Sequence, residues 1–216
     1  RYLVGQLLDG KNIALITDAG TPGISDPGEE LVAMCCEAGI EVTSLPGAAA
    51  CITALTLSGL PTRRFAFEAF LPSDKKERAC ILQELKNETR TIILYEAPHR
   101  LVKTLEELYA ELGDRKISLC RELTKKHETV FRDTLSQAIA WYKENPPKGE
   151  CVMVLAGRPR EELVLEERQK WGNMSLEEHL AIYEKEGMSR KDAMKQVAKD
   201  RGIRKRDVYQ ALLNQE

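Results

Sequence analysis

The sequence has no long hydrophobic run, few aromatic residues and no excess of charge of either sign. None of its apolar stretches approaches the roughly 20 residues that a membrane helix needs. Aromatic residues make up 6% of the 216 residues, and 32 Lys and Arg stand against 34 Asp and Glu, which gives a formal net charge of −2. Near-neutral charge provides no global signal for nucleic acid or for an anionic membrane, but it is compatible with a local patch.

The spacing of the cysteines matches neither a metal site nor a disulfide scaffold. Most of the six stand in apolar stretches, where a reduced Cys behaves as a small hydrophobic residue. These observations predict a cytoplasmic protein without a metal ion. The remaining composition, 43% hydrophobic and 31% charged, is typical of a globular protein. The chain is long enough for one large or two small domains.

Strand and helix patterns alternate along the first three quarters of the chain. The expected strands are residues 12–17, 40–45, 65–70, 91–95, 116–122 and 150–155. This alternation predicts an α/β protein with largely parallel sheets. A proline and two arginines at residues 61–64 indicate a boundary. We therefore expect an N-terminal α/β domain over residues 1–62 and a C-terminal α/β domain over residues 63–158.

Positive charge gathers at the C-terminus. After a charged linker, residues 159–174, we expect a basic helical extension over residues 175–216, opened by a capping box of Ser175 and Glu178. Residues 188–210 hold eight Lys and Arg against three Asp, a local charge of +5. Their helix–glycine–helix pattern resembles a helix-turn-helix whose basic surface binds phosphates. A helical tail that packs on a partner subunit is the alternative.

Two loops of small residues follow the first two expected strands. Residues 18–28 read DAGTPGISDPG, and residues 46–50 read PGAAA. Small residues at the carboxyl end of a strand let a ligand approach the backbone closely. Two such loops on successive strands would face one crevice, so a shared ligand site is expected. Each loop alone is also compatible with a structural turn or with tight helix–sheet packing.

Two polar motifs follow later strands. The motif YEAPHR, residues 95–100, places His99 and Arg100 near the positive end of a helix dipole. This arrangement indicates a nearby anion, or a pairing of Arg100 with a structural carboxylate such as Glu96. The motif RELTKKHE, residues 121–128, is either a solvated loop or a functional segment. His127 has no partner at metal-ligand spacing.

These four motifs, together with FEAFLP at residues 67–72, occur in an order that resembles a known family. The chain is similar over residues 1–158 to the ribosomal RNA small subunit methyltransferase I family, a 2′-O-ribose methyltransferase branch of the tetrapyrrole methylase superfamily. The resemblance implies two α/β domains of the tetrapyrrole methylase type, with S-adenosylmethionine in the cleft between them. It also implies a homodimer and a cytidine of 16S ribosomal RNA, in the small ribosomal subunit, as the substrate.

Site residues follow from the same resemblance. Glu96 would face the cofactor from the second domain. The other residues expected at the cofactor are Asp18, Ala19, Gly20, Thr21, Ile24, Ser25, Gly47, Ala49 and Ala50. Because a ribose 2′-hydroxyl is a poor nucleophile, a nearby base or cation should help it lose its proton. The candidates for this catalytic role are Lys125, His127 and Glu128.

The sequence departs from the family pattern at its N-terminus. Members begin with a strand and a glycine-containing loop, whereas this sequence starts at Arg1 inside a helical pattern. We therefore expect a first domain that lacks its N-terminal strand. Two other functions stay open: a methylase of a tetrapyrrole or other small molecule, and a non-enzymatic helix-turn-helix protein that binds nucleic acid. Ala19, Gly20 and Thr21 stand where precorrin methylases have Gly-Asp-Pro, which favours the RNA branch.

Overall fold

The computed structural model describes residues 1–172 and 174–213, which fall into two compact units, Arg1–Gly157 and Arg158–Glu216. Residue 173 of the expected linker and residues 214–216 of the expected extension lie outside the described residues. The expected boundary between residues 62 and 63 falls inside the first unit and stays a prediction. Among the described residues, no helix is long and apolar enough to span a membrane.

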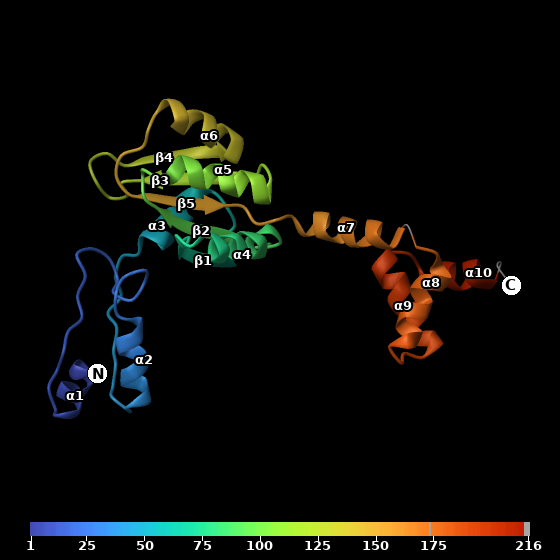
Figure 1. Cartoon of the computed structure of the whole chain (residues 1–216), viewed down its shortest axis with the longest axis horizontal. Coiled ribbons are helices and arrows are strands. Elements are labelled where there is room, and N and C mark those ends of the chain that lie inside the picture. Colours follow the sequence, from blue (N-terminus) through green and yellow to red (C-terminus); the bar gives the residue numbers. More distant parts are fainter. Residues whose placement is uncertain (173, 214–216) are drawn as a thin grey trace. The chain divides into compact units, whose positions relative to one another are not determined.

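A five-stranded sheet forms the centre of the first unit (Figure 1). Its strands stand in the order β1-β2-β5-β3-β4. Their bounds are Phe65–Phe70 for β1, Thr91–Glu96 for β2, Lys116–Arg121 for β3, Thr129–Thr134 for β4 and Cys151–Leu155 for β5.

The expectation of largely parallel sheets is wrong, because β1 and β2 are the one parallel pair of neighbours in this sheet. The connection between β3 and β4 is too short for a crossover, so these strands pair antiparallel. Strand β5 then enters between β2 and β3 and runs antiparallel to both.

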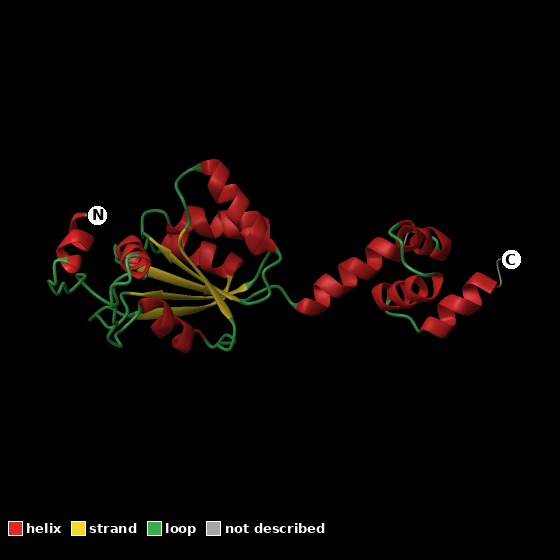
Figure 2. Ribbon diagram, turned by 90° about the horizontal axis from the view of Figure 1, so that it is seen from below, coloured by secondary structure: helices red, strands yellow, loops and turns green. Residues whose placement is uncertain are grey.

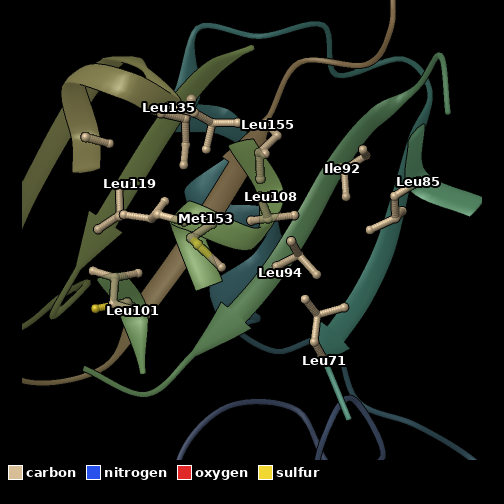
Figure 3. Close-up of a cluster of buried hydrophobic side chains, with 14 of the residues drawn as sticks. Leu71, Leu85, Ile92, Leu94, Leu101, Leu108, Leu119, Leu135, Met153 and Leu155 are labelled. Carbon is tan, nitrogen blue, oxygen red and sulfur yellow. The ribbon is translucent and has the colours of Figure 1, made fainter. Parts of the chain in front are cut away.

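Helices cover both faces of the sheet (Figure 2). Helices α4 (Lys75–Lys86), α5 (Leu101–Leu112) and α6 (Leu135–Glu144) pack on one face, and α3 (Ala50–Ser58) packs on the other. Because side chains alternate along a strand, Leu94 of β2 joins the first core and its neighbour Ile93 joins the second. Figure 3 shows the first core, where leucines from the helices meet Met153 of β5.

The first two expected strands are not formed. Residues 12–17 and 40–45 are extended, but the described residues contain no backbone hydrogen bond between these two segments or from either to the sheet. An extended segment becomes a strand only when a neighbour pairs with its backbone groups. Ile16 and Leu45 are accordingly 82% and 83% exposed. The helices nearby are α1 (Tyr2–Leu8) and α2 (Glu29–Glu37).

The second unit is helical. Its helices are α7 (Arg160–Gly172), α8 (Leu176–Lys185), α9 (Arg190–Arg201) and α10 (Lys205–Leu213). The expected capping box is present, with the Ser175 hydroxyl accepting from the amide of Glu178 and the Glu178 carboxylate accepting from that of Ser175. Most of the expected linker forms α7, which packs against α9. A small core from α8, α9 and α10 includes Leu180, Val197 and Val208.

Candidate functional site

The sheet topology brings three motifs to one edge. Since β5 runs antiparallel to both β2 and β3, strand β3 is parallel to β1 and β2. The carboxyl ends of β1, β2 and β3 therefore lie at the same edge of the sheet. The segments that leave these ends belong to FEAFLP, YEAPHR and RELTKKHE. Ligands of open α/β sheets bind at such edges.

The 18–28 loop and the 46–50 turn touch each other, as the sequence predicts. The hydroxyl of Thr21 donates a hydrogen bond of 3.0 Å to the carbonyl oxygen of Ala48. A Cβ atom added to Gly47 would lie 3.0 Å from the Thr21 hydroxyl, and one added to Gly20 would lie 3.3 Å from the Ala48 oxygen. Gly20 also has a φ of +82°, which other residues rarely adopt. The contact between the loops therefore depends on small residues.

Tyr95 joins these loops to the sheet. Its hydroxyl accepts a hydrogen bond of 3.0 Å from the backbone amide of Cys51, in the first turn of α3. The rings of Phe67 and Phe70 contact its ring edge-to-face, at centroid distances of 5.1 Å and 5.6 Å. Burial raises the pKa of Tyr95, so its hydroxyl stays protonated. The end of β2 is thus fixed against the start of α3.

Glu96 is buried in a polar network at the same strand end. Its side chain is 1% exposed and accepts from the amide of Ala97 at 2.9 Å and from the hydroxyl of Thr104 at 2.6 Å. The guanidinium of Arg100 lies 3.4 Å away, which is the structural pairing that the sequence left as an alternative. Arg78 in turn donates to the Thr104 hydroxyl at 2.7 Å. These contacts position the YEAPHR segment, and the expected contact of Glu96 with a cofactor stays a prediction.

The three candidate catalytic residues lie on one exposed loop after β3. The amine of Lys125 lies 3.0 Å from a carboxylate oxygen of Glu150 and 3.2 Å from one of Glu122. Glu150 first, and then Glu122, raises the pKa of Lys125, so this side chain is a cation and not a proton acceptor. Glu128 accepts a hydrogen bond of 2.7 Å from the amide of Thr124, and the side chain of His127 is exposed. Their catalytic role stays a prediction.

Strained backbone marks the same motifs. The non-glycine residues with positive φ in the described part of the chain are Ser25, Ala69, Glu122 and Thr124, with φ between 50° and 65°. Each lies in one of the five motifs. Such conformations cost about 1–3 kcal/mol each and cluster at functional sites. Sequence reasoning missed this signal, and it also missed Phe70 and Tyr95, the aromatic residues at the carboxyl ends of two adjacent strands.

Solved structures of two methyltransferases share this fold. The methyltransferase CobJ superposes with a TM-score of 0.55 at 19% identity, covering 72% of this chain and 69% of that one. Uroporphyrin-III-C-methyltransferase from Thermus thermophilus gives a TM-score of 0.51 at 21% identity, covering 72% and 68%. At these identities the likeness concerns the fold.

Sequence comparison is more specific. The family profile of the tetrapyrrole (corrin/porphyrin) methylases matches residues 1–139. The ribosomal RNA small subunit methyltransferase I of Synechocystis sp. is 48% identical over 215 residues, which cover 99% of this chain and 75% of that protein. Its namesake from Bacillus subtilis is 46% identical over 209 residues, covering 97% and 71%. The chain, a mixed α/β protein, therefore belongs to the tetrapyrrole methylase family and, within it, to the ribosomal RNA small subunit methyltransferase I family.

Proposed function

We propose that this protein transfers a methyl group from S-adenosylmethionine to the ribose 2′-hydroxyl of a cytidine in 16S ribosomal RNA. In this proposal it acts in the cytoplasm as a homodimer on the small ribosomal subunit. The observation that carries the proposal is that three motifs lie at one sheet edge, in a chain that belongs to a methyltransferase family. Hydrogen bonds of Tyr95 and Thr21 join the other two motifs to them.

The residues of the two loops fit such a cofactor. Gly20 and Gly47 let the two loops approach each other closely, because a Cβ atom at either position would crowd the facing loop. The 46–50 turn leads directly into α3, whose first amides lie at the positive end of the helix dipole. The 18–28 loop and the 46–50 turn would hold the cofactor, with their mutual position fixed by the bond from Thr21 to Ala48.

Methyl transfer mainly requires that the two reacting groups be positioned. When bound, the sulfonium cofactor supplies an electrophilic methyl group. The protein must hold the ribose oxygen in line for transfer, which lowers the entropic part of the barrier. Lys125, which is paired with Glu150 and Glu122, is the candidate to supply positive charge as the hydroxyl loses its proton. His127 and Glu128 are the candidates to accept that proton.

The second unit offers a surface for RNA phosphates. Lys191, Lys195 and Lys199 recur every four residues along α9, are exposed, and lie on the side of the helix opposite the buried Ala193 and Val197. We call these three side chains the lysine stripe. Among the described residues of this unit, none forms an ion pair with these three lysines. A row of unpaired cations of this kind binds a phosphate backbone in any sequence context.

A methyl-transfer assay tests the proposal. The full chain is incubated with radiolabelled S-adenosylmethionine and small ribosomal subunits from a strain that lacks this modification. We expect label in 16S RNA, resistant to alkaline hydrolysis at one position because the 2′-oxygen is blocked. Label in a corrinoid precursor but not in RNA would support the small-molecule alternative. Calorimetric titration that detects no cofactor binding would favour a non-enzymatic binding protein.

A further inference from the structure

A bulge in β1 determines where Phe70 points. Phe67 pairs with Ile93 of β2, but the next pair joins Ala69 to Leu94, so Glu68 is the extra residue. Ala69 has a φ of +50°, in the left-handed region that alanine rarely adopts. β-Bulges are common at sheet edges and next to active sites, where they redirect a side chain.

The register shows what the bulge changes. With it, Phe70 pairs with Tyr95 and shares the face of the sheet that α3 covers. In a regular strand, Phe70 would pair with Glu96 and lie on the opposite face, because a shift of one residue moves a side chain to the other side. Glu68 would then pair with Leu94, which belongs to the first core. The strained conformation therefore moves an aromatic ring to the α3 face.

Phe70 is not buried by this move. Its side chain is 50% exposed, although the adjacent Leu71 is 2% exposed. Its ring is held edge-to-face by Tyr95, which is itself anchored to the amide of Cys51. The result is a ring that is fixed in orientation and open to solvent, at the carboxyl end of the strand that forms the sheet's edge.

A cationic side chain bonds to the backbone of the residue that follows Phe70. The guanidinium of Arg100 donates to the carbonyl oxygen of Leu71 at 3.2 Å, and its side chain is 32% exposed. Arg100 is also paired with Glu96, so the exposed aromatic face is the group that can bind a nucleotide, whose base stacks on it. An edge strand also leaves space for a polymer to continue past the site. A nucleobase of RNA therefore fits this position better than an uncharged apolar ligand.

We propose that Phe70 is a stacking platform for a nucleobase of the substrate RNA, next to the ribose that is methylated. This inference rests on the proposed function. It adds a residue that positions the RNA, which accepts the methyl group, and not the cofactor. The face of the ring that the Tyr95 contact leaves open receives the base. The bulge at Glu68 places that ring on the α3 face.

Substitution of Phe70 in the full chain tests the inference. Phe70→Ala and Phe70→Leu should each lower kcat/KM for the small ribosomal subunit about tenfold or more, since a stacked base contributes on that order. Phe70→Trp should retain most of the activity because it keeps an aromatic face. Calorimetry should give cofactor affinities within about twofold of the unsubstituted protein for all three variants, since the two loops are unchanged. Tyr109→Ala, at an aromatic residue 43% exposed on α5, is the matched control and should change neither quantity.

Three outcomes would overturn the stacking role. They are full activity of Phe70→Ala, equal activity of the Leu and Trp variants, and a loss of cofactor affinity that matches the loss of activity. A stable fold is checked by the thermal unfolding midpoint. If the unsubstituted chain transfers no methyl group, the proposed function fails. In that case, fluorescence anisotropy with a single-stranded cytidine-rich RNA tests the stacking role. The Phe70→Ala variant must bind this RNA more weakly than the unsubstituted chain.

Discussion

The hydroxyl of Thr21 donates a hydrogen bond of 3.0 Å to the carbonyl oxygen of Ala48, 27 residues further along the chain. This bond ties the 18–28 loop to the 46–50 turn. The 18–28 loop and residues 46–49 lie outside regular secondary structure. Their mutual position therefore depends on this bond and on the close approach that Gly20 and Gly47 allow.

Thr21→Val removes this bond and keeps the shape of the side chain. We expect cofactor affinity to fall about threefold to tenfold, because a net hydrogen bond contributes about 0.5–1.5 kcal/mol. Calorimetric titration with S-adenosylmethionine measures the effect. Thr56→Val is the control, since its hydroxyl bonds to a carbonyl three residues earlier within α3. Equal affinities for the two variants would contradict a role of the Thr21 bond in the site.

Thr104→Val should destabilise the first unit. Thr104 is 1% exposed, and its hydroxyl is both a donor to Glu96 and an acceptor from Arg78. Its loss leaves two buried charged groups with one partner fewer, at a cost of about 1–3 kcal/mol. Denaturant unfolding measures this change. Thr104→Ser keeps the hydroxyl and should recover most of the loss, whereas a Thr104→Val variant as stable as the unsubstituted protein would contradict the role of the hydroxyl.

The stability of the second unit should depend on pH through His179. Its Nδ1 accepts from the guanidinium of Arg201 at 3.1 Å, so the ring proton sits on Nε2, 3.4 Å from a carboxylate oxygen of Asp200. Burial first, and then Arg201, lowers the pKa of His179 below 6.5. The unfolded chain therefore binds the proton at a higher pH than the folded one. The contribution of the neutral His179 to the stability of the second unit is fully present above pH 6.5. It falls as the pH drops below that value.

Trp171 provides the measurement, because its ring stacks on His179 at a centroid distance of 3.8 Å. In a Trp141→Phe background it is the one remaining tryptophan. Thermal unfolding followed by its fluorescence should shift to lower temperature between pH 7 and pH 5. His179→Gln removes the titrating group and should flatten this shift. A shift of the same size in that variant would show that other groups cause it.

The lysine stripe should contribute to RNA binding through charge alone. Replacing Lys191, Lys195 and Lys199 together by Gln should weaken binding to 16S RNA. It should also reduce the slope of log affinity against log salt concentration by about 2–3, since each phosphate contact contributes about 0.7–0.9. Fluorescence anisotropy over a salt series gives the slope. A matched triple substitution of exposed lysines on α4, Lys75, Lys76 and Lys86, should leave it unchanged.

Much of the local structure was predictable. Strand β1 has the expected bounds, β2 lies within one residue of its expected range, and the capping box at Ser175 is present. The 18–28 loop contacts the 46–50 turn, as expected, through the bond from Thr21 to Ala48 and not through paired strands. The strand patterns themselves at residues 12–17 and 40–45 did not produce strands, since apolar periodicity specifies a face and not a partner.

The sequence by itself determined most of the elements and the motifs, because capping, periodicity and small-residue turns depend on residues a few positions apart. Tertiary structure decided the rest. Insertion of β5 between β2 and β3 pairs Ile93 with Val154, and the bulge that turns Phe70 toward Tyr95 exists only as an offset between two strands. The burial of Glu96 against Thr104 likewise needs α5 in place. These features are relations between distant segments, and no local pattern specifies them.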